Sequence, residues 1–118
     1  MDENDAVSVY AEEIISKIPP LSEEEESDLW RHVKSADKTE SELAKRRLIE
    51  SKLHLVLSIV ERYSASGVSM LDLIQEGNLG LPKAVDTFAE SSENNFTVHA
   101  AALIESAIVS AITQADSS

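Results

Sequence analysis

The sequence predicts an all-α protein, a compact bundle of about five or six helices forming one domain over residues 1–118. Apolar residues recur at three- and four-residue steps through most of the chain, which is the spacing of one helix face. At three places a serine or threonine stands three residues before an acidic residue, the pattern of a capping box at a helix N-terminus. Prolines and a glycine separate these stretches, as they do where helices end.

Length and composition limit the class of protein. A chain of 118 residues with 42% hydrophobic residues is typical of one folded domain. The absence of cysteine excludes a disulfide framework and a thiolate metal site. No apolar run approaches the ~20 residues of a membrane span, and the acidic N-terminus does not resemble a signal peptide. We therefore expect a cytoplasmic protein without membrane contact.

The net charge of -12 is unevenly distributed. Residues 1–30 hold ten acidic side chains and one basic one, whereas residues 31–63 hold eight basic and five acidic ones. Residues 64–118 hold seven acidic side chains and a single cation, Lys83. Cations that neutralise phosphates supply most nucleic-acid affinity. The last third of the chain should therefore repel DNA, and DNA binding by this chain alone is not expected.

Residues 1–36 are predicted to contain two helices. The first runs from Asp5 to Ile18 and stops at two consecutive prolines. The second opens at Ser22 with Glu25 in the capping-box position, and its glutamate-rich first turn suits the helix dipole. We interpret this acidic run as a solvated helix start, with an interaction surface as the alternative.

A single long helix is predicted over residues 39–66, the core helix of the bundle. Thr39 and Glu42 have capping-box spacing at its start, and Gly67 serves as its C-cap. Its apolar residues form a nearly continuous stripe.

Two features have simple structural interpretations. A lone tryptophan such as Trp30 is usually buried packing. The one basic cluster, Lys45-Arg46-Arg47, is interpreted as a solvated helix face paired with Glu42 and Glu50.

The stretch Leu71–Leu81 organises the next predicted helix, over residues 69–88, for which Ser69 and Asp72 supply a capping box. Helical spacing places its apolar and polar residues on separate faces: Leu71, Ile74 and Leu81 with Leu73 on one, and Asp72, Gln75, Glu76 and Asn78 on or beside the other.

Two glycines, Gly77 and Gly80, interrupt this helix, and each costs ~1 kcal/mol relative to alanine. Such a cost indicates that something approaches the backbone closely. Either a neighbouring helix of the same core or a partner protein on the polar face would explain it.

Pro82 is expected to kink or break that helix near Gly80, because it clashes with the carbonyl group of Asn78. A polar loop follows, and a last helix is predicted over residues 97–116, capped by Thr97 and apolar on one side.

No chemistry of catalysis is visible. His32, His54 and His99 lack metal-ligand spacing, and the chain has no phosphate-binding glycine loop and no nucleophile elbow. We expect no enzyme, no catalytic residue, no metal and no cofactor. A binding module is the default interpretation.

The chain resembles the central helical domain (sigma region two) of bacterial RNA polymerase sigma factors of the sigma-seventy family. The resemblance runs through the segments DAVSVY from Asp5, LSEEE from Leu21, AKRRLIESKLHLV from Ala44 and, most closely, LDLIQEGNLGL from Leu71. It implies that the helix from Leu71 docks on the clamp helices of the largest subunit of the polymerase core. The implied contact residues are Leu71, Asp72, Gln75, Glu76 and Asn78, with Pro82 at a position where the family usually has methionine.

The part of the family pattern that melts and reads the minus-ten promoter element is degenerate in this chain. Aromatic residues stack on unpaired bases, and each such partner is worth ~1–3 kcal/mol. His99 stands where the family has tyrosine, and Ala102 and Leu103 replace its tryptophan pair. Glu105 and Ser110 replace arginines, and Ser106 replaces the base-reading glutamine.

Three hypotheses follow from the resemblance. The first is a regulator that binds the polymerase core and competes with true sigma factors, but has lost promoter melting and minus-ten recognition. The second is the docking half of an initiation factor, whose promoter contacts come from a second sigma subunit, with residual DNA binding at Lys45-Arg46-Arg47. The third is a decoy for an anti-sigma protein, or a relic without function. We expect the chain to end before the domains that read the upstream promoter element.

Overall fold

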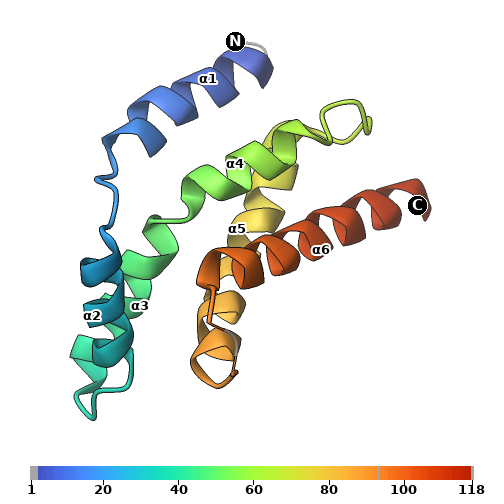
Figure 1. The fold of residues 1–118 in the computed structure, drawn as a ribbon. Coiled ribbons are helices and arrows are strands. Elements are labelled where there is room, and N and C mark those ends of the chain that lie inside the picture. Colours follow the sequence, from blue (N-terminus) through green and yellow to red (C-terminus); the bar gives the residue numbers. More distant parts are fainter. Residues whose placement is uncertain (1–2, 93, 118) are drawn as a thin grey trace.

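A computed structural model describes residues 3–92 and 94–117. No strand occurs in these described parts, so the all-α prediction is confirmed. Along these residues the helices follow in the order α1 (Glu3–Glu13), the short 3-10 helix η1 (Ile15–Lys17), α2 (Glu23–Val33), α3 (Lys38–Glu50), α4 (Leu53–Glu61), α5 (Met70–Ala89) and α6 (Phe96–Ser117). Figure 1 labels the six α-helices that lie in the described residues.

Helix α5 occupies the centre of the arrangement. It contacts α6, α4, α3 and α1, while α2 packs mainly beside α3 at one end of the molecule (Figure 1). The molecule measures 43 × 31 × 22 Å. Because its neighbours surround only part of α5, one side of this helix remains open to solvent.

The hydrophobic core comes mainly from α3 to α6. The largest fully buried side chains are Leu48, Ile59, Leu73, Leu81, Ile104, Ile108, Val56, Val60 and Val85. Burying one such side chain is worth roughly 1.5–3 kcal/mol. Helices α1 and α2 each contribute one buried apolar residue, Val7 and Val33, and are therefore attached to this core by less apolar surface.

The capping box at the start of α2 is confirmed. The Ser22 hydroxyl accepts a hydrogen bond from the Glu25 N–H, and the Glu25 carboxylate accepts one from the Ser22 N–H, both at 3.1 Å. The backbone hydrogen bond from Ser22 is the main cause that lowers the pKa of Glu25.

The prediction of one continuous helix over residues 39–66 is wrong. The region forms two helices, because α3 ends at Glu50 and α4 begins at Leu53. The Ser51 hydroxyl donates to the Leu48 carbonyl at 2.6 Å, a local bond that competes with the helix ladder. Lys52 then adopts non-helical dihedral angles, φ -110° and ψ 4°.

The other end of this region also differs from the prediction. Asp37, not Thr39, caps α3, with its carboxylate accepting from the Glu40 N–H at 3.2 Å. Helix α4 ends at Glu61 in tightened turns, so Gly67 (φ 88°) closes the following turns and not the helix itself.

The first and last helices also have different ends. Helix α1 stops at Glu13, and η1 replaces the predicted continuation to Ile18. Asn95 caps α6, since its side-chain oxygen accepts from the Val98 N–H at 3.1 Å, so the predicted capping role of Thr97 is wrong.

Helix α6 is unusually apolar for a helix at the surface. By length and composition alone, its segment Phe96–Asp116 is long and apolar enough to cross a membrane. An 18-residue window in this segment has a mean hydropathy of 1.5, and 22% of that window is buried. The expectation that no such run exists is therefore wrong for α6. The same test is passed by core helices of soluble proteins, so it is weak evidence for a membrane span.

Candidate functional site

The open side of α5 carries the residues that the sequence singled out. Asp72, Gln75, Glu76 and Pro82 are exposed, whereas the core side of the helix is buried. We define the outward face of α5 as Leu71, Asp72, Gln75, Glu76, Leu79 and Pro82. Within the described parts of the chain, the side chains of Asp72, Gln75 and Glu76 make no hydrogen bond or ion pair, so they are available to a partner.

Two leucines of this face are more exposed than sequence reasoning indicated. Leu71 was assigned to the core side but is 40% exposed, and Leu79, which was assigned no role, is 65% exposed. Leu71, Gln75 and Leu79 follow at four-residue steps and thus form one stripe. The sequence did carry a signal, because Leu79 stands two residues before Leu81 and such a step places it on the opposite side of a helix from that core leucine.

The start of α5 is stabilised by a different residue from the one predicted. Ser69 occupies the N-cap position but makes no capping hydrogen bond, so the Ser69–Asp72 capping box is wrong. Instead, the Glu3 carboxylate of α1 accepts a hydrogen bond from the Met70 N–H. A carboxylate there suits the helix dipole, and it ties α1 to α5.

The two glycines of α5 face other helices, not the solvent. A Cβ atom on Gly77 would lie 2.7 Å from Val56 Cγ1 and 3.4 Å from Ile104 Cγ2, while one on Gly80 would lie 3.5 Å from the Leu103 carbonyl oxygen. Of the two explanations left open, the close approach of neighbouring helices is the one observed. The glycines let α4 and α6 pack tightly on α5.

Asn78 lies at the edge of the outward face, against α1. Its side-chain amide donates to the Tyr10 hydroxyl at 3.4 Å, a long bond, and its Oδ1 atom is buried without a partner among the described residues. A buried polar atom left unpaired costs roughly 1–3 kcal/mol. Asn78 is therefore turned towards α1 and is not freely exposed beside Gln75 and Glu76.

The sequence predicts a kink or a break near Gly80, and the break is wrong, because α5 is helical from Met70 to Ala89 with Pro82 inside it. Pro82 is exposed and lines a hollow of about 230 Å³ between α3 and α5. Lys45 and Ile49 lie on its α3 side.

The basic cluster of α3 is only partly paired as predicted. Lys45 Nζ lies 3.9 Å from the Glu42 carboxylate and 3.2 Å from that of Asp86. Arg47 instead donates to the Pro19 carbonyl at 2.7 Å, and no ion pair with Glu50 occurs in the described parts of the chain. Arg46 is exposed.

The positions that resemble the family's DNA-reading residues lie along α6. Ala102, Ser106 and Ser110 are exposed, and Leu103 is partly buried against the core. His99 Nε2 lies 2.7 Å from the Thr87 hydroxyl oxygen, and its ring packs on Phe88 at 5.5 Å. None of these positions is Lys or Arg, and none is Tyr or Trp.

Glu105, the remaining position, is engaged within the domain. Its carboxylate accepts a hydrogen bond from the Tyr63 hydroxyl at 2.6 Å and lies 3.6 Å from the Arg62 guanidinium group. The hydrogen bond to Glu105 is the main cause that raises the pKa of Tyr63, and desolvation adds to it.

This bond predicts a loss of stability at alkaline pH. Since the pKa of Tyr63 is raised in the folded state, its contribution is fully present below the ordinary tyrosine value of about 10 and is lost as pH rises through the folded-state value. We expect the thermal unfolding temperature to fall above about pH 10, and to fall less in Tyr63→Phe. Tyr10→Phe is the control. If the unfolding temperature fell equally in the natural chain and in the Tyr63→Phe variant, this assignment would be contradicted.

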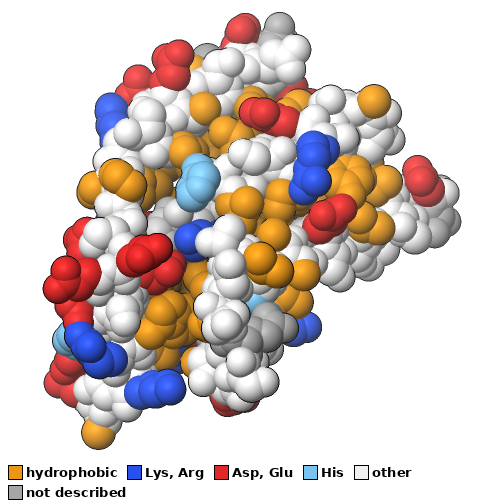
Figure 2. Space-filling model, in the orientation of Figure 1, with side chains coloured by type: hydrophobic (Ala, Val, Ile, Leu, Met, Phe, Trp, Pro, Cys, Tyr) orange, Lys and Arg blue, Asp and Glu red, His pale blue; other side chains and the backbone are white. Residues whose placement is uncertain are grey.

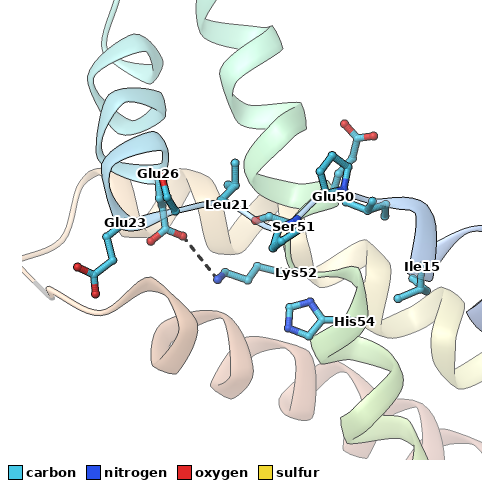
Figure 3. Close-up of a pocket in the computed structure, with 12 residues that line it drawn as sticks. Ile15, Leu21, Glu23, Glu26, Glu50, Ser51, Lys52 and His54 are labelled. Carbon is cyan, nitrogen blue, oxygen red and sulfur yellow. Dashed lines mark ion pairs between the residues drawn. The ribbon is translucent and has the colours of Figure 1, made fainter.

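Lys52, at the break between α3 and α4, connects three parts of the fold. Its ammonium group lies 3.5 Å from the Glu26 carboxylate and donates to the Thr97 hydroxyl at 3.0 Å. Figure 3 shows the ion pair between Lys52 and Glu26. Both residues and His54 line a hollow of about 380 Å³. Sequence reasoning missed this role, which depends on residues 26 and 45 positions away.

Charged side chains gather on parts of the surface. Figure 2 shows acidic side chains over α1 and α2, and several Lys and Arg side chains near the α2–α3 turn. No group of three or more His, Asp or Glu residues that could hold a metal ion occurs in residues 3–92 and 94–117.

Comparison with known proteins shows which family this chain belongs to. The family described as Sigma-70 region 2 matches residues 48–118. Over 109 residues the chain is 45% identical to RNA polymerase sigma factor SigA of Clostridium acetobutylicum and 44% identical to RNA polymerase sigma factor SigA of a Bacillus species. Each alignment covers 92% of this chain and 28% of the relative, so the chain spans 28% of the length of these sigma factors. With most of its length matched, and α5 and α6 both inside the matched region, the chain belongs to the sigma-70 family.

Proposed function

We propose that this domain binds the core of RNA polymerase, at the clamp helices of the largest subunit, and regulates transcription without opening promoters itself. Membership of the family and the name of its relatives, RNA polymerase sigma factor, support the polymerase as the partner. The observation that most supports this proposal is a contrast between two helices. The outward face of α5 is exposed to solvent, whereas α6 has no Lys or Arg that could bind a DNA phosphate. The domain acts as a binding module in the cytoplasm and not as an enzyme.

The chemistry of the outward face suits protein docking. Exposed Leu71 and Leu79 supply apolar area, while Asp72, Gln75 and Glu76 supply polar groups that have no partner among the described residues. Interfaces combine an apolar centre with such polar groups around it. Helices α4 and α6 pack against the buried side of α5, so the outward face is left for a partner.

The chemistry of α6 does not suit promoter melting. Its outward residues Ala102, Ser106 and Ser110 can neither stack on bases nor neutralise phosphates. Glu105 adds a negative charge and is bonded to Tyr63. The added charge opposes the approach of single-stranded DNA.

A second candidate is that another chain supplies the promoter contacts. Val98 and Val109 are 64% and 42% exposed on α6, which leaves apolar area that a second subunit or an anti-sigma protein could cover. A gel shift with core polymerase and minus-ten DNA separates the candidates. A sequence-specific shift that appears only when a second sigma subunit is added favours this second candidate, and a shift by this domain without an added chain would contradict both.

The docking face is tested by a double substitution, Gln75→Ala with Glu76→Arg. We expect it to weaken binding to core polymerase by about tenfold or more, equivalent to ~1.4 kcal/mol, because it removes two exposed polar contacts and reverses one charge. The measurement is competition with a housekeeping sigma factor for fluorescently labelled core polymerase.

The matched control is Glu12→Arg, which reverses one charge on an exposed residue of α1, away from the outward face of α5. Its affinity should stay within about twofold of the natural chain, since a peripheral charge contributes little. If the natural chain neither bound core polymerase nor competed with the sigma factor, the proposal would be contradicted.

A further inference from the structure

The turn between α2 and α3 carries positive charge in a protein that is acidic elsewhere. Residues 31–47 hold six Lys and Arg side chains and three Asp and Glu side chains, whereas the rest of the chain holds four and nineteen. The α2–α3 pair forms one end of the molecule in Figure 1, and Figure 2 shows several of these cations near its turn. One end of a negatively charged domain is therefore positively charged.

Some of these cations have no partner within the protein. Arg31 and Lys45 pair with carboxylates, and Arg47 donates to a backbone carbonyl group. The exposed cations of the segment whose side chains make no hydrogen bond or ion pair within the described residues are Lys34, Lys38 and Arg46. Unpaired cations gathered at one end favour a partner that carries negative charge.

An exposed leucine lies among these cations. Leu43 of α3 is 61% exposed. On one side it lines an open hollow of about 460 Å³ together with Lys38 and Arg46. On the other side it lines a hollow of about 240 Å³, whose apolar wall includes Leu29 and Ala44. Leu43 therefore forms an apolar ridge between two hollows, and apolar side chains of a partner could pack against both of its sides.

An acidic protein segment fits this end better than a nucleic acid does. Nucleic acids present an even row of phosphates, and cations that neutralise them supply most of the affinity. Here Glu42 lines the larger hollow and Glu40 lines the smaller one, so a row of phosphates would meet carboxylates as well as cations. The charges of a peptide are unevenly spaced and can avoid these carboxylates. A peptide can also cover the exposed Leu43, which a phosphate backbone cannot.

We propose that the α2–α3 end is a second docking surface, which binds an acidic protein segment that carries apolar side chains. We define the basic tip as Lys34, Lys38, Leu43 and Arg46. Leu43 is the apolar centre, and the cations around it pair with carboxylates of the partner. The basic tip lies on α2 and α3 and not on α5, so this interaction goes beyond the proposed function and does not depend on it.

The test uses the full chain and a synthetic peptide of glutamates with leucines at helical spacing, followed by fluorescence anisotropy. A protein of net charge -12 should repel this peptide unless a local site attracts it. We expect saturable binding that weakens as salt is added. Lys38→Glu should weaken binding about tenfold or more, because it replaces an attraction with a repulsion. Leu43→Ala should weaken it about fivefold, through the loss of apolar contact.

The matched controls are Lys17→Glu and Leu79→Ala, which make the same kinds of change at exposed residues outside the basic tip. Both should leave the affinity for the peptide within about twofold of the natural chain. In competition for core polymerase the pattern should reverse. Leu79→Ala, on the outward face of α5, should weaken polymerase binding, whereas Lys38→Glu and Leu43→Ala should leave it unchanged.

A second peptide, with glutamine in place of every glutamate, tests the charge requirement. No saturable binding of the acidic peptide, or equal binding of both peptides, would overturn the proposal. Binding of duplex DNA that Lys38→Glu weakens and Leu43→Ala does not would assign the tip to phosphates instead. A concentration-dependent dimer that Lys38→Glu abolishes would assign it to a second copy of the chain. If the chain binds the peptide but no core polymerase, the proposed function fails and the basic tip stands.

Discussion

Replacing Gly77 with leucine should lower the free energy of unfolding by about 3 kcal/mol, enough to remove much of the stability of a small domain. A Cβ atom alone would approach Val56 Cγ1 to 2.7 Å, and leucine places three further carbon atoms towards Ile104 and Ile108. Val56 is fully buried and β-branched, so its side chain cannot rotate away cheaply. Urea denaturation followed by circular dichroism measures the change.

Gly80→Ala is the control for this prediction, and its effect should have the opposite sign. A Cβ atom there would meet the Leu103 carbonyl oxygen at 3.5 Å, an ordinary contact. Alanine should then raise the free energy of unfolding by up to about 1 kcal/mol through its helix propensity. Equal effects at Gly77 and Gly80 would contradict the packing of α4 and α6 on α5 described above.

Trp30→Ala should cost about 3 kcal/mol of unfolding free energy, at the lower end for a tryptophan truncation because the ring is only partly buried. The ring centroid lies 4.9 Å from that of Phe88 and 5.0 Å from that of Phe96, the latter in an edge-on arrangement. This aromatic cluster joins α2 to the end of α5 and the start of α6. Its loss leaves a gap where three helices meet.

Trp30→Phe keeps an aromatic ring in the cluster and should cost clearly less, about 1 kcal/mol. Because Trp30 is the only tryptophan, unfolding should be followed by circular dichroism and not by tryptophan fluorescence. A cost below about 1 kcal/mol for Trp30→Ala would show that the cluster is peripheral to the fold.

The fold class and the position of the docking helix could be predicted from local sequence patterns. Helical periodicity predicted the buried Leu73, Ile74 and Leu81, and the Ser22–Glu25 spacing predicted a capping box that is present. Both signals depend on residues within one or two turns of each other. Such short-range physics is fully contained in the sequence.

Several of the errors arise where distant residues intervene. Ser69 has capping-box spacing, yet a carboxylate 67 positions before Met70 takes the bond at the start of α5. The sequence places Asn78 on or beside the polar face, but in the structure its side chain bonds to Tyr10 of α1. The long helix breaks at Ser51, and the next residue, Lys52, bonds to α2 and α6. None of these long-range contacts has a local signal.

The cation-free side of α6 bears on how this protein finds its target. Many DNA-associated proteins shorten their search by sliding and hopping along the duplex, held there by contacts with phosphates. On the proposed function, we expect a domain with net charge -12 and no Lys or Arg after Lys83 to lack such a hold on the duplex. We then expect it to reach its partner by diffusion through solution. Added salt, which screens the mutual repulsion between the domain and nearby DNA, eases that encounter.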